Sequence, residues 1–227
     1  MQIPLSDLIH LMHEAPHAIL STHSTQMPGF PFGTAVPLIV DEHHRPILLI
    51  SALAEHTKNL QADGRASLAI LAPGTSNVQD AARATMIGTF SPFTPSASLV
   101  KRYLRYQPAA EQYLQLDFSF FRMEIERTRY IGGVGRMGWL EKTDWTDAFC
   151  INSDTEQELV TVVAEKLPAH IRVLGIDAYG VDHEVNGIRE RHRFSNPTEA
   201  SELGNASQDW PDDWSRSDAN SAVDDKI

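Results

Sequence analysis

The stretch from residue 51 to residue 65 carries the densest set of side chains that could bind an anion. Its candidate binding residues are Ser51, His56, Thr57, Lys58, Asn59 and Arg65. Hydroxyl groups, an amide, an imidazole and cations around a short helix are suited to binding a phosphate or a carboxylate. An ordinary capped surface helix has the same composition, so both interpretations are open at this point.

A glycine-rich segment, Gly132 to Gly135, follows a long apolar and polar run at residues 118–131. Because glycine has no Cβ, Gly133 and Gly135 would allow the backbone to approach a planar cofactor closely. The same glycines would also suit a bulged or sharply turned strand end. The chain contains no P-loop or Gly-x-Ser-x-Gly motif. The spacings of Gly133–Gly138 and His13–His17 match Gly-x-Gly-x-x-Gly and His-Glu-x-x-His, but the glycine segment opens no obvious helix and Pro16 ends the N-terminal helix before His17. No single motif therefore identifies a reaction.

The histidines and the cysteine give weaker signals. His10, His13 and His17 have roughly helical spacing, but a metal or haem role for them is not favoured. His43 and His44 lie in a polar turn and are expected to face solvent. The single cysteine of the chain excludes internal disulfides and any Cys-based zinc or iron–sulfur cage.

Hydrophobic periodicity predicts the elements that position these residues. The expected order is an amphipathic helix from Leu5, five short strands between residues 17 and 90 with a polar helix among them, a helix after Thr94-Pro95, and a long half-buried strand at 118–131. Short, mostly antiparallel strands with interposed helices predict an α+β protein built on a closed or split β-barrel.

A second unit is expected near residue 150. Ser153 and Glu156 form a capping-box pattern that opens a helix, and two or three strands follow. We therefore predict a split barrel at residues 1–147, a small α/β appendage at 148–200 and an acidic tail at 201–227. About 50 residues is little for an independent core, so the appendage should pack against the barrel or a second subunit.

Charge excludes several classes of function. The 227 residues include 30 Asp and Glu against 19 Lys and Arg, a net charge of −11. This balance, with no basic stripe, argues against nucleic-acid binding and against docking on anionic membranes. No apolar run approaches the roughly 20 residues of a membrane span, and the N-terminal stretch lacks Lys and Arg, unlike a signal peptide. Cytoplasm is the expected location.

The tail has seven acidic and two basic residues and no hydrophobic periodicity. Such a composition buries too little apolar surface to offset its ordering entropy, so disorder is expected. Alternatively, Trp210 and Trp214 dock on a partner or on the body of the protein.

Three segments resemble a known family. Asn59-Leu60-Gln61-Ala62-Asp63-Gly64-Arg65-Ala66-Ser67-Leu68, the strand ATMIGTF and the segment RYIGGVGRMGWL resemble pyridoxamine 5'-phosphate oxidase-like, FMN-binding split barrels, and specifically their haem-utilisation branch. Residues 151–197 resemble the small domain of unknown function that is appended to this branch. The resemblance covers about residues 5–197.

The resemblance implies a homodimer with small-molecule cofactor sites at the subunit interface, with haem favoured and FMN as the alternative. It places Ser51, His56, Thr57, Lys58, Asn59, Arg65, Gly133 and Gly135 around the cofactor. Haem-degrading relatives take an axial iron ligand from a C-terminal loop. Because residues from 201 onward contain no histidine, the candidate iron ligands are His192, His183 and His170.

Three functions follow as hypotheses. The favoured one is a haem-binding, oxygenase-like protein that opens the porphyrin with O2 and an electron donor during iron recovery. The second is an FMN-dependent oxidoreductase, although the carboxylate of Glu55 would repel a flavin phosphate. The third is a non-catalytic split barrel that regulates a partner enzyme.

Overall fold

The structure, a computed structural model, describes residues 3–133 and 135–203. An eight-stranded antiparallel sheet forms the larger part. Its elements are α1 (Leu5–Glu14), β1 (His17–His23), β2 (Pro31–Pro37), β3 (Ile39–Val40), β4 (Pro46–Ser51), α2 (Glu55–Ala62), β5 (Arg65–Leu71), β6 (Arg83–Pro92), α3 (Ala97–Tyr106), the 3-10 helix η1 (Pro108–Gln115), β7 (Phe118–Ile131), β8 (Met137–Glu141) and the 3-10 helix η2 (Lys142–Trp145). The strand order is β2-β1-β5-β6-β7-β4-β3, and β8 also pairs with β7.

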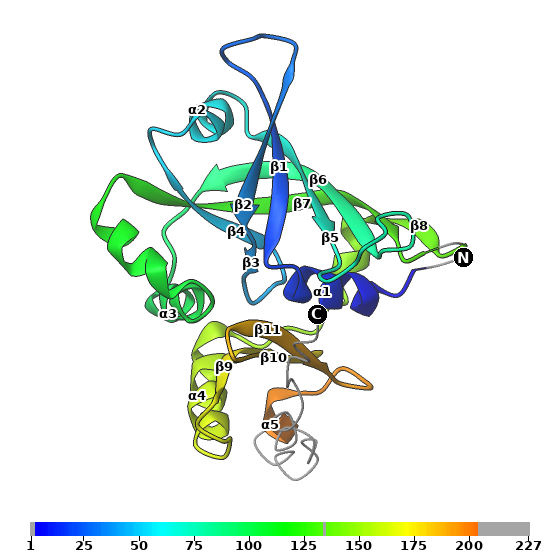
Figure 1. The fold of residues 1–227 in the computed structure, drawn as a ribbon, viewed down its shortest axis with the longest axis vertical. Coiled ribbons are helices and arrows are strands. Elements are labelled where there is room, and N and C mark those ends of the chain that lie inside the picture. Colours follow the sequence, from blue (N-terminus) through cyan, green and yellow to red (C-terminus); the bar gives the residue numbers. More distant parts are fainter. Residues whose placement is uncertain (1–2, 134, 204–227) are drawn as a thin grey trace, which may run out of the picture.

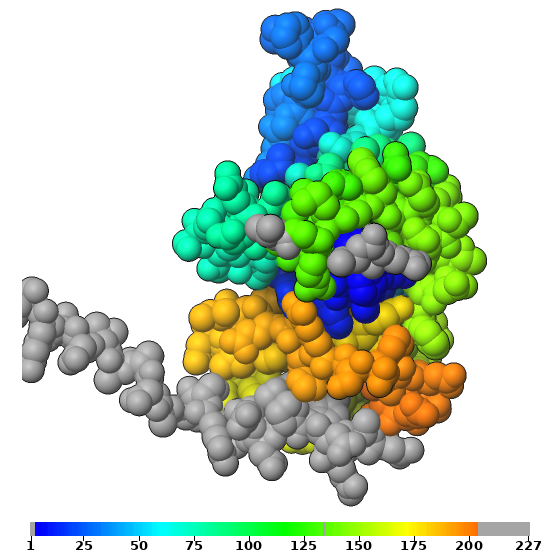
Figure 2. Space-filling view, turned by 90° about the vertical axis from the view of Figure 1, so that its right-hand side faces the viewer, coloured from blue at the N-terminus to red at the C-terminus, as the bar shows by residue number. Residues whose placement is uncertain are grey.

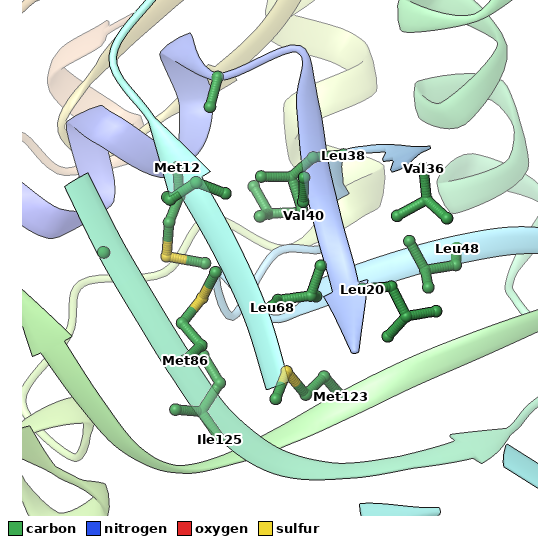
Figure 3. Packing of buried hydrophobic residues seen from close by; sticks show 14 of the residues in the cluster. Met12, Leu20, Val36, Leu38, Val40, Leu48, Leu68, Met86, Met123 and Ile125 are labelled. Carbon is green, nitrogen blue, oxygen red and sulfur yellow. The ribbon is translucent and has the colours of Figure 1, made fainter. Parts of the chain in front are cut away.

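The strands of the sheet alternate buried and exposed side chains, and the sheet curls so that the buried ones form a hydrophobic core. In β7, Phe121, Met123 and Ile125 face inward, as the sequence pattern predicts, and they meet Leu20 of β1 and Met86 of β6. Figure 3 shows Leu20, Met86, Met123 and Ile125 converging from different strands. The expected α+β class and split barrel are confirmed by this sheet.

A smaller unit follows the barrel. It contains α4 (Ser153–Ala164), β9 (Ile171–Asp177), β10 (Gly180–Val185), β11 (Ile188–Arg193) and α5 (Ala200–Leu203), and its strands form a separate sheet in the order β11-β10-β9. The barrel sheet ends at Glu141 and the second sheet begins at Ile171, so the boundary at 147/148 stays a prediction.

Helix α1 joins the two units. Leu8, Leu11 and Met12 pack in the barrel core, whereas Ile9 belongs to the core of the C-terminal unit. Figure 1 shows α1 between the curled sheet and the three-stranded sheet, and Figure 2 shows it, in dark blue, between the barrel and the orange C-terminal unit. The C-terminal unit therefore packs against the barrel of its own chain.

Two expectations need correction. His44 is buried in the turn between β3 and β4, not solvated, because the C-terminal unit and α1 cover it. The tail was expected to be disordered from residue 201, but α5 extends to Leu203, whose side chain is buried in the C-terminal core. The remainder of the tail, with Trp210 and Trp214, lies outside the described residues. No described helix is long and apolar enough to span a bilayer.

Candidate functional site

One face of the barrel sheet points away from the core and is covered by none of the described elements. Cross-strand pairing places its side chains in rows: Ile19 of β1 lies level with Ala69 of β5, Thr85 of β6 and Arg129 of β7. We call this surface the outer sheet face; its members used below are His17, Ile19, Ser21, His23, Arg65, Ser67, Leu71, Arg83, Thr85, Ile87, Thr89, Arg129 and Trp139.

The outer sheet face exposes large apolar side chains. Ile19, Ile87 and Trp139 are 48 %, 44 % and 43 % exposed. Exposed apolar patches of this kind mark binding surfaces more often than isolated hydrophobic residues do. The face is therefore the strongest candidate for binding a ligand or another subunit.

An apolar hollow of about 580 Å³ lies at one end of the outer sheet face. Its walls include Ile19, Leu71 and Val78, and its polar side chains include His17, Arg83 and Arg129. A mostly apolar hollow with a few polar groups is typical of small-molecule sites, and this volume suits a ligand of drug or cofactor size.

A second hollow, of about 460 Å³, lies at the other end of the same strands. Most of its surface is apolar, but we call it the polar hollow because its lining residues include several with hydroxyl groups or charges: Ser21, His23, Arg65, Ser67, Thr89 and Glu126. Arg65 is paired with Asp63 at 2.6 Å, and this guanidinium holds the pKa of the Asp63 carboxyl well below its usual range. Of the residues predicted to bind an anion, Arg65 therefore lies in the polar hollow.

Helix α2 uses much of its polar surface inside the chain. The Asn59 amide donates to Thr22 Oγ1 at 3.0 Å, and its Oδ1 accepts from the backbone and hydroxyl of Thr25, both at 2.9 Å. Thr57 is also buried, whereas Lys58 is exposed. His56 is half-buried, and burial lowers its pKa. Asn59 therefore fastens α2 to the barrel, while the buried Thr57 hydroxyl has no hydrogen-bond partner among the described residues. Of the four predicted ligand residues on α2, His56 and Lys58 reach the surface.

The other predicted cofactor residues lie apart from one another within one chain. Ser51 donates to Asp117 at the Phe118 end of β7, while Gly133 and Gly135 follow the Ile131 end. A strand of this length spans about 40 Å, and Figure 1 shows α2 and β8 on opposite sides of the barrel. Gly133 and Gly135 adopt φ values of +109° and +79°, which explains why glycine is suited to this turn.

The three predicted iron ligands all lie in the C-terminal unit and line neither hollow. His170 is exposed in the turn before β9. His183 is buried on β10, 3.4 Å from Glu190. His192 on β11 is half-buried beside Phe194, and burial, followed by His183, lowers its pKa.

Sequence reasoning missed a buried polar cluster where α1 meets the C-terminal unit. We call it the junction cluster: His13, His44, Tyr106, Asp177, Asp182 and Arg191. All six are buried or nearly so, and they come from α1, the β3–β4 turn, α3 and the three strands of the second sheet. The available signal was weak, namely acidic residues inside an otherwise apolar strand pattern at 171–185.

Comparison with known proteins identifies the family. The sequence model described as CREG, beta-barrel matches residues 10–147, which is more than half of the chain. The chain belongs to this family. This CREG β-barrel chain is 32 % identical, over 133 residues, to the non-canonical, chloroplastic heme oxygenase HOZ of Arabidopsis thaliana. The match covers 58 % of this chain and 41 % of HOZ, so the chain spans less than half of that relative.

Solved structures extend the likeness of this CREG β-barrel protein to the C-terminal unit. A heme-binding protein from Mycobacterium smegmatis superposes with a TM-score of 0.59 at 23 % identity, over 92 % of this chain and 100 % of that one. Protein Atu2129 of Agrobacterium tumefaciens, of unknown function, gives a TM-score of 0.70 at 19 % identity over 89 % and 93 % of the two chains. These neighbours confirm the fold, and the resemblance to haem-handling split barrels is confirmed.

Proposed function

We propose that this protein binds haem on the outer sheet face and acts in haem utilisation. The observation that carries the proposal is the apolar hollow, which combines apolar walls with one histidine and two arginines. A porphyrin has a broad apolar ring, two propionates and an iron that accepts an imidazole ligand. Ile19 and Leu71 would contact the ring, Arg83 and Arg129 would pair with the propionates, and His17 would be the iron ligand.

His17 takes precedence over the three ligands inferred from the sequence because it lines the hollow. His170, His183 and His192 belong to the C-terminal unit and would need a different binding surface. Bound haem would supply O2-activating iron, and the protein's own residues would orient the ring and exclude water from one of its faces. The relatives include a heme oxygenase and a heme-binding protein, which supports haem as the ligand.

We also propose that a second copy of the chain covers the outer sheet face as a homodimer. The exposed apolar side chains of the face would be buried by such an interface. A dimer could also bring the Gly133 and Gly135 turn of one subunit towards the ligand of the other, which would reunite the residues that lie apart in one chain. The proposed location is the cytoplasm.

Haem titration of the purified chain tests the proposal. We expect a shifted Soret band, saturation at a fixed ratio per chain, and at least a tenfold weaker affinity in His17→Ala. The matched control is His23→Ala, which removes an exposed histidine from the same face and strand and should bind haem as the wild type does. Absence of a Soret shift, or full binding by His17→Ala with loss in His192→Ala, would contradict this site.

The polar hollow favours FMN as a second candidate ligand. Ser21, Ser67 and Thr89 offer hydroxyl groups beside Arg65, a set suited to a phosphate, although Glu126 lies in the same hollow. Flavin absorbance in the purified protein, or binding of added FMN that is lost in Arg65→Ala, would support this candidate. A dimer that binds neither haem nor FMN but retains a stoichiometric partner protein would instead support the non-catalytic, regulatory function.

A further inference from the structure

The junction cluster contains three metal-ligand atoms that converge on one point. Arg191 bridges two carboxylates through one oxygen each: Nη1 donates to Asp182 Oδ1 at 2.6 Å and Nη2 donates to Asp177 Oδ1 at 2.9 Å. The other oxygen of each carboxylate faces His13, whose Nδ1 lies 2.8 Å from Asp182 Oδ2 and 3.3 Å from Asp177 Oδ2. The three atoms all lie within 4.8 Å of one another.

The hydrogen bonds of the two histidines define where the protons are. His44 Nε2 lies 3.1 Å from the Phe149 carbonyl, which can only accept, so this nitrogen carries the hydrogen of a neutral His44. His44 Nδ1 then accepts from His13 Nε2 at 3.2 Å. In a neutral His13, Nδ1 therefore has a lone pair that points at two carboxylate oxygens.

Three acceptor atoms within 4.8 Å of one another and without a hydrogen between them repel one another, so a cation at their centre would stabilise the arrangement.

Asp177 supplies an independent sign of a missing partner. Its Oδ2 is buried and finds no hydrogen-bond donor among the described residues, whereas Asp182 Oδ2 accepts from the Tyr106 hydroxyl at 2.6 Å. Arg102 and Arg189 add positive charge nearby, but neither guanidinium donates a hydrogen bond to Asp177 Oδ2, since Arg102 pairs with Glu156 and Arg189 donates to the His13 carbonyl.

We propose that His13 Nδ1, Asp177 Oδ2 and Asp182 Oδ2 bind one divalent cation of the zinc class, which joins α1 to the C-terminal strands. Imidazole nitrogens and carboxylate oxygens are both ordinary zinc ligands, and a water could complete a four-coordinate site. With zinc–ligand distances of about 2.1 Å, tetrahedral ligand atoms lie about 3.4 Å apart, close to the separations of His13 Nδ1 from the two carboxylates. His44 would orient His13 through its second ring nitrogen, as the outer partners of zinc-bound histidines do.

Metal analysis of the full chain, purified without a polyhistidine tag, tests the site. We expect about one zinc per chain, tetrahedral absorption bands when Co2+ replaces it, and a lower thermal midpoint after chelation that zinc restores. Asp177→Asn and His13→Gln should each bind at least tenfold less tightly. The control is His10→Gln on the same helix, whose ring accepts from Arg191 but belongs to no ligand set.

Three outcomes would overturn the proposal. They are wild-type protein that stays metal-free with zinc in excess, Asp177→Asn that binds zinc like the wild type, and a thermal midpoint that neither chelation nor added zinc changes. If the variants fail to fold, the zinc and chelator titrations of the wild type still decide. Because the site lies away from the outer sheet face, haem binding and zinc binding can fail separately.

Discussion

The junction cluster and the outer sheet face use the same side-chain types in opposite environments. Arg191 in the junction is 1 % exposed and bridges two buried carboxylates, whereas Arg65 on the face is 74 % exposed and pairs with its sequence neighbour Asp63. Ion pairs at an exposed site contribute little, but removing one partner of a buried pair leaves an uncompensated charge. The junction is therefore built to hold one arrangement of the two units, and the face is left open to bind something else.

Hydrophobic side chains show the reverse distribution. At the junction, Ile9 and Tyr179 are buried around the polar cluster. On the face, Ile19 and Ile87 are exposed although neighbouring residues in the same strands are fully buried. Exposed apolar side chains beside exposed charged ones are typical of a binding surface without its ligand.

The largest effect is expected from Arg191→Met. The change leaves Asp177 and Asp182 facing each other without their shared guanidinium, and it should lower the free energy of unfolding by about 3–5 kcal/mol. Chemical denaturation measures the loss. Arg193→Ala, on the same strand but with an exposed pair to Glu14, should cost less than about 1 kcal/mol. Equal losses in both variants would show that burial does not distinguish the junction.

The second-largest effect is expected from acid, which should lower the free energy of unfolding through the junction. Burial lowers the pKa of His44 to about 4 in the folded protein, against about 6.5 for histidine in the unfolded chain, so between these values the unfolded chain binds more protons. Stability should therefore be complete above pH 6.5 and fall as the pH falls towards 4, by about 3 kcal/mol in total. Denaturation at pH 7 and at pH 4.5, on zinc-free protein, measures the slope. His44→Asn, which tolerates the positive φ at this position, should flatten it.

A substitution on the face should change assembly and not folding. Ile87→Glu places a charge in the centre of the apolar surface and should weaken self-association by about 2 kcal/mol, or roughly thirtyfold. Light scattering across a concentration series detects the change. Leu116→Glu, at a more exposed apolar position directly after η1, should leave the oligomeric state unchanged. A monomeric wild type would remove the proposed dimer altogether.

The sequence predicted the face better than the junction, for a physical reason. The strands of the face follow from residue alternation and short turns, which are local properties, so β1, β5, β6 and β7 appear close to their expected places. Even local signals shift at the ends of elements. The helix expected from the Ser153–Glu156 pattern begins at Ser153, but Asn152 is its cap, and Ser153 instead donates to Glu42.

The junction could not be predicted because its contacts join distant residues. His13 meets Asp182 across 169 positions of sequence, and His44 is covered by segments that follow it by more than 100 residues. From the sequence alone, a polar turn such as 41–45 is expected to face solvent, because the docking of a distant unit on it leaves no local signal. Likewise, Asn59 was predicted to bind a ligand because an amide can do so. In the structure its amide is already hydrogen-bonded to Thr22 of β1 and to Thr25 of the β1–β2 loop.

The smallest effect is expected from Arg65→Ala, and it separates the two hollows of the face. Because the Arg65 side chain is mostly exposed, the thermal midpoint should not change measurably. Haem affinity should stay within about twofold, since Arg65 does not line the apolar hollow, whereas FMN affinity should fall about tenfold if a phosphate binds among the hydroxyl groups. Parallel titrations with both ligands, with Arg83→Ala as the variant of the apolar hollow, measure this. A loss of haem binding in Arg65→Ala as large as that in Arg83→Ala would mean that one ligand spans the whole face.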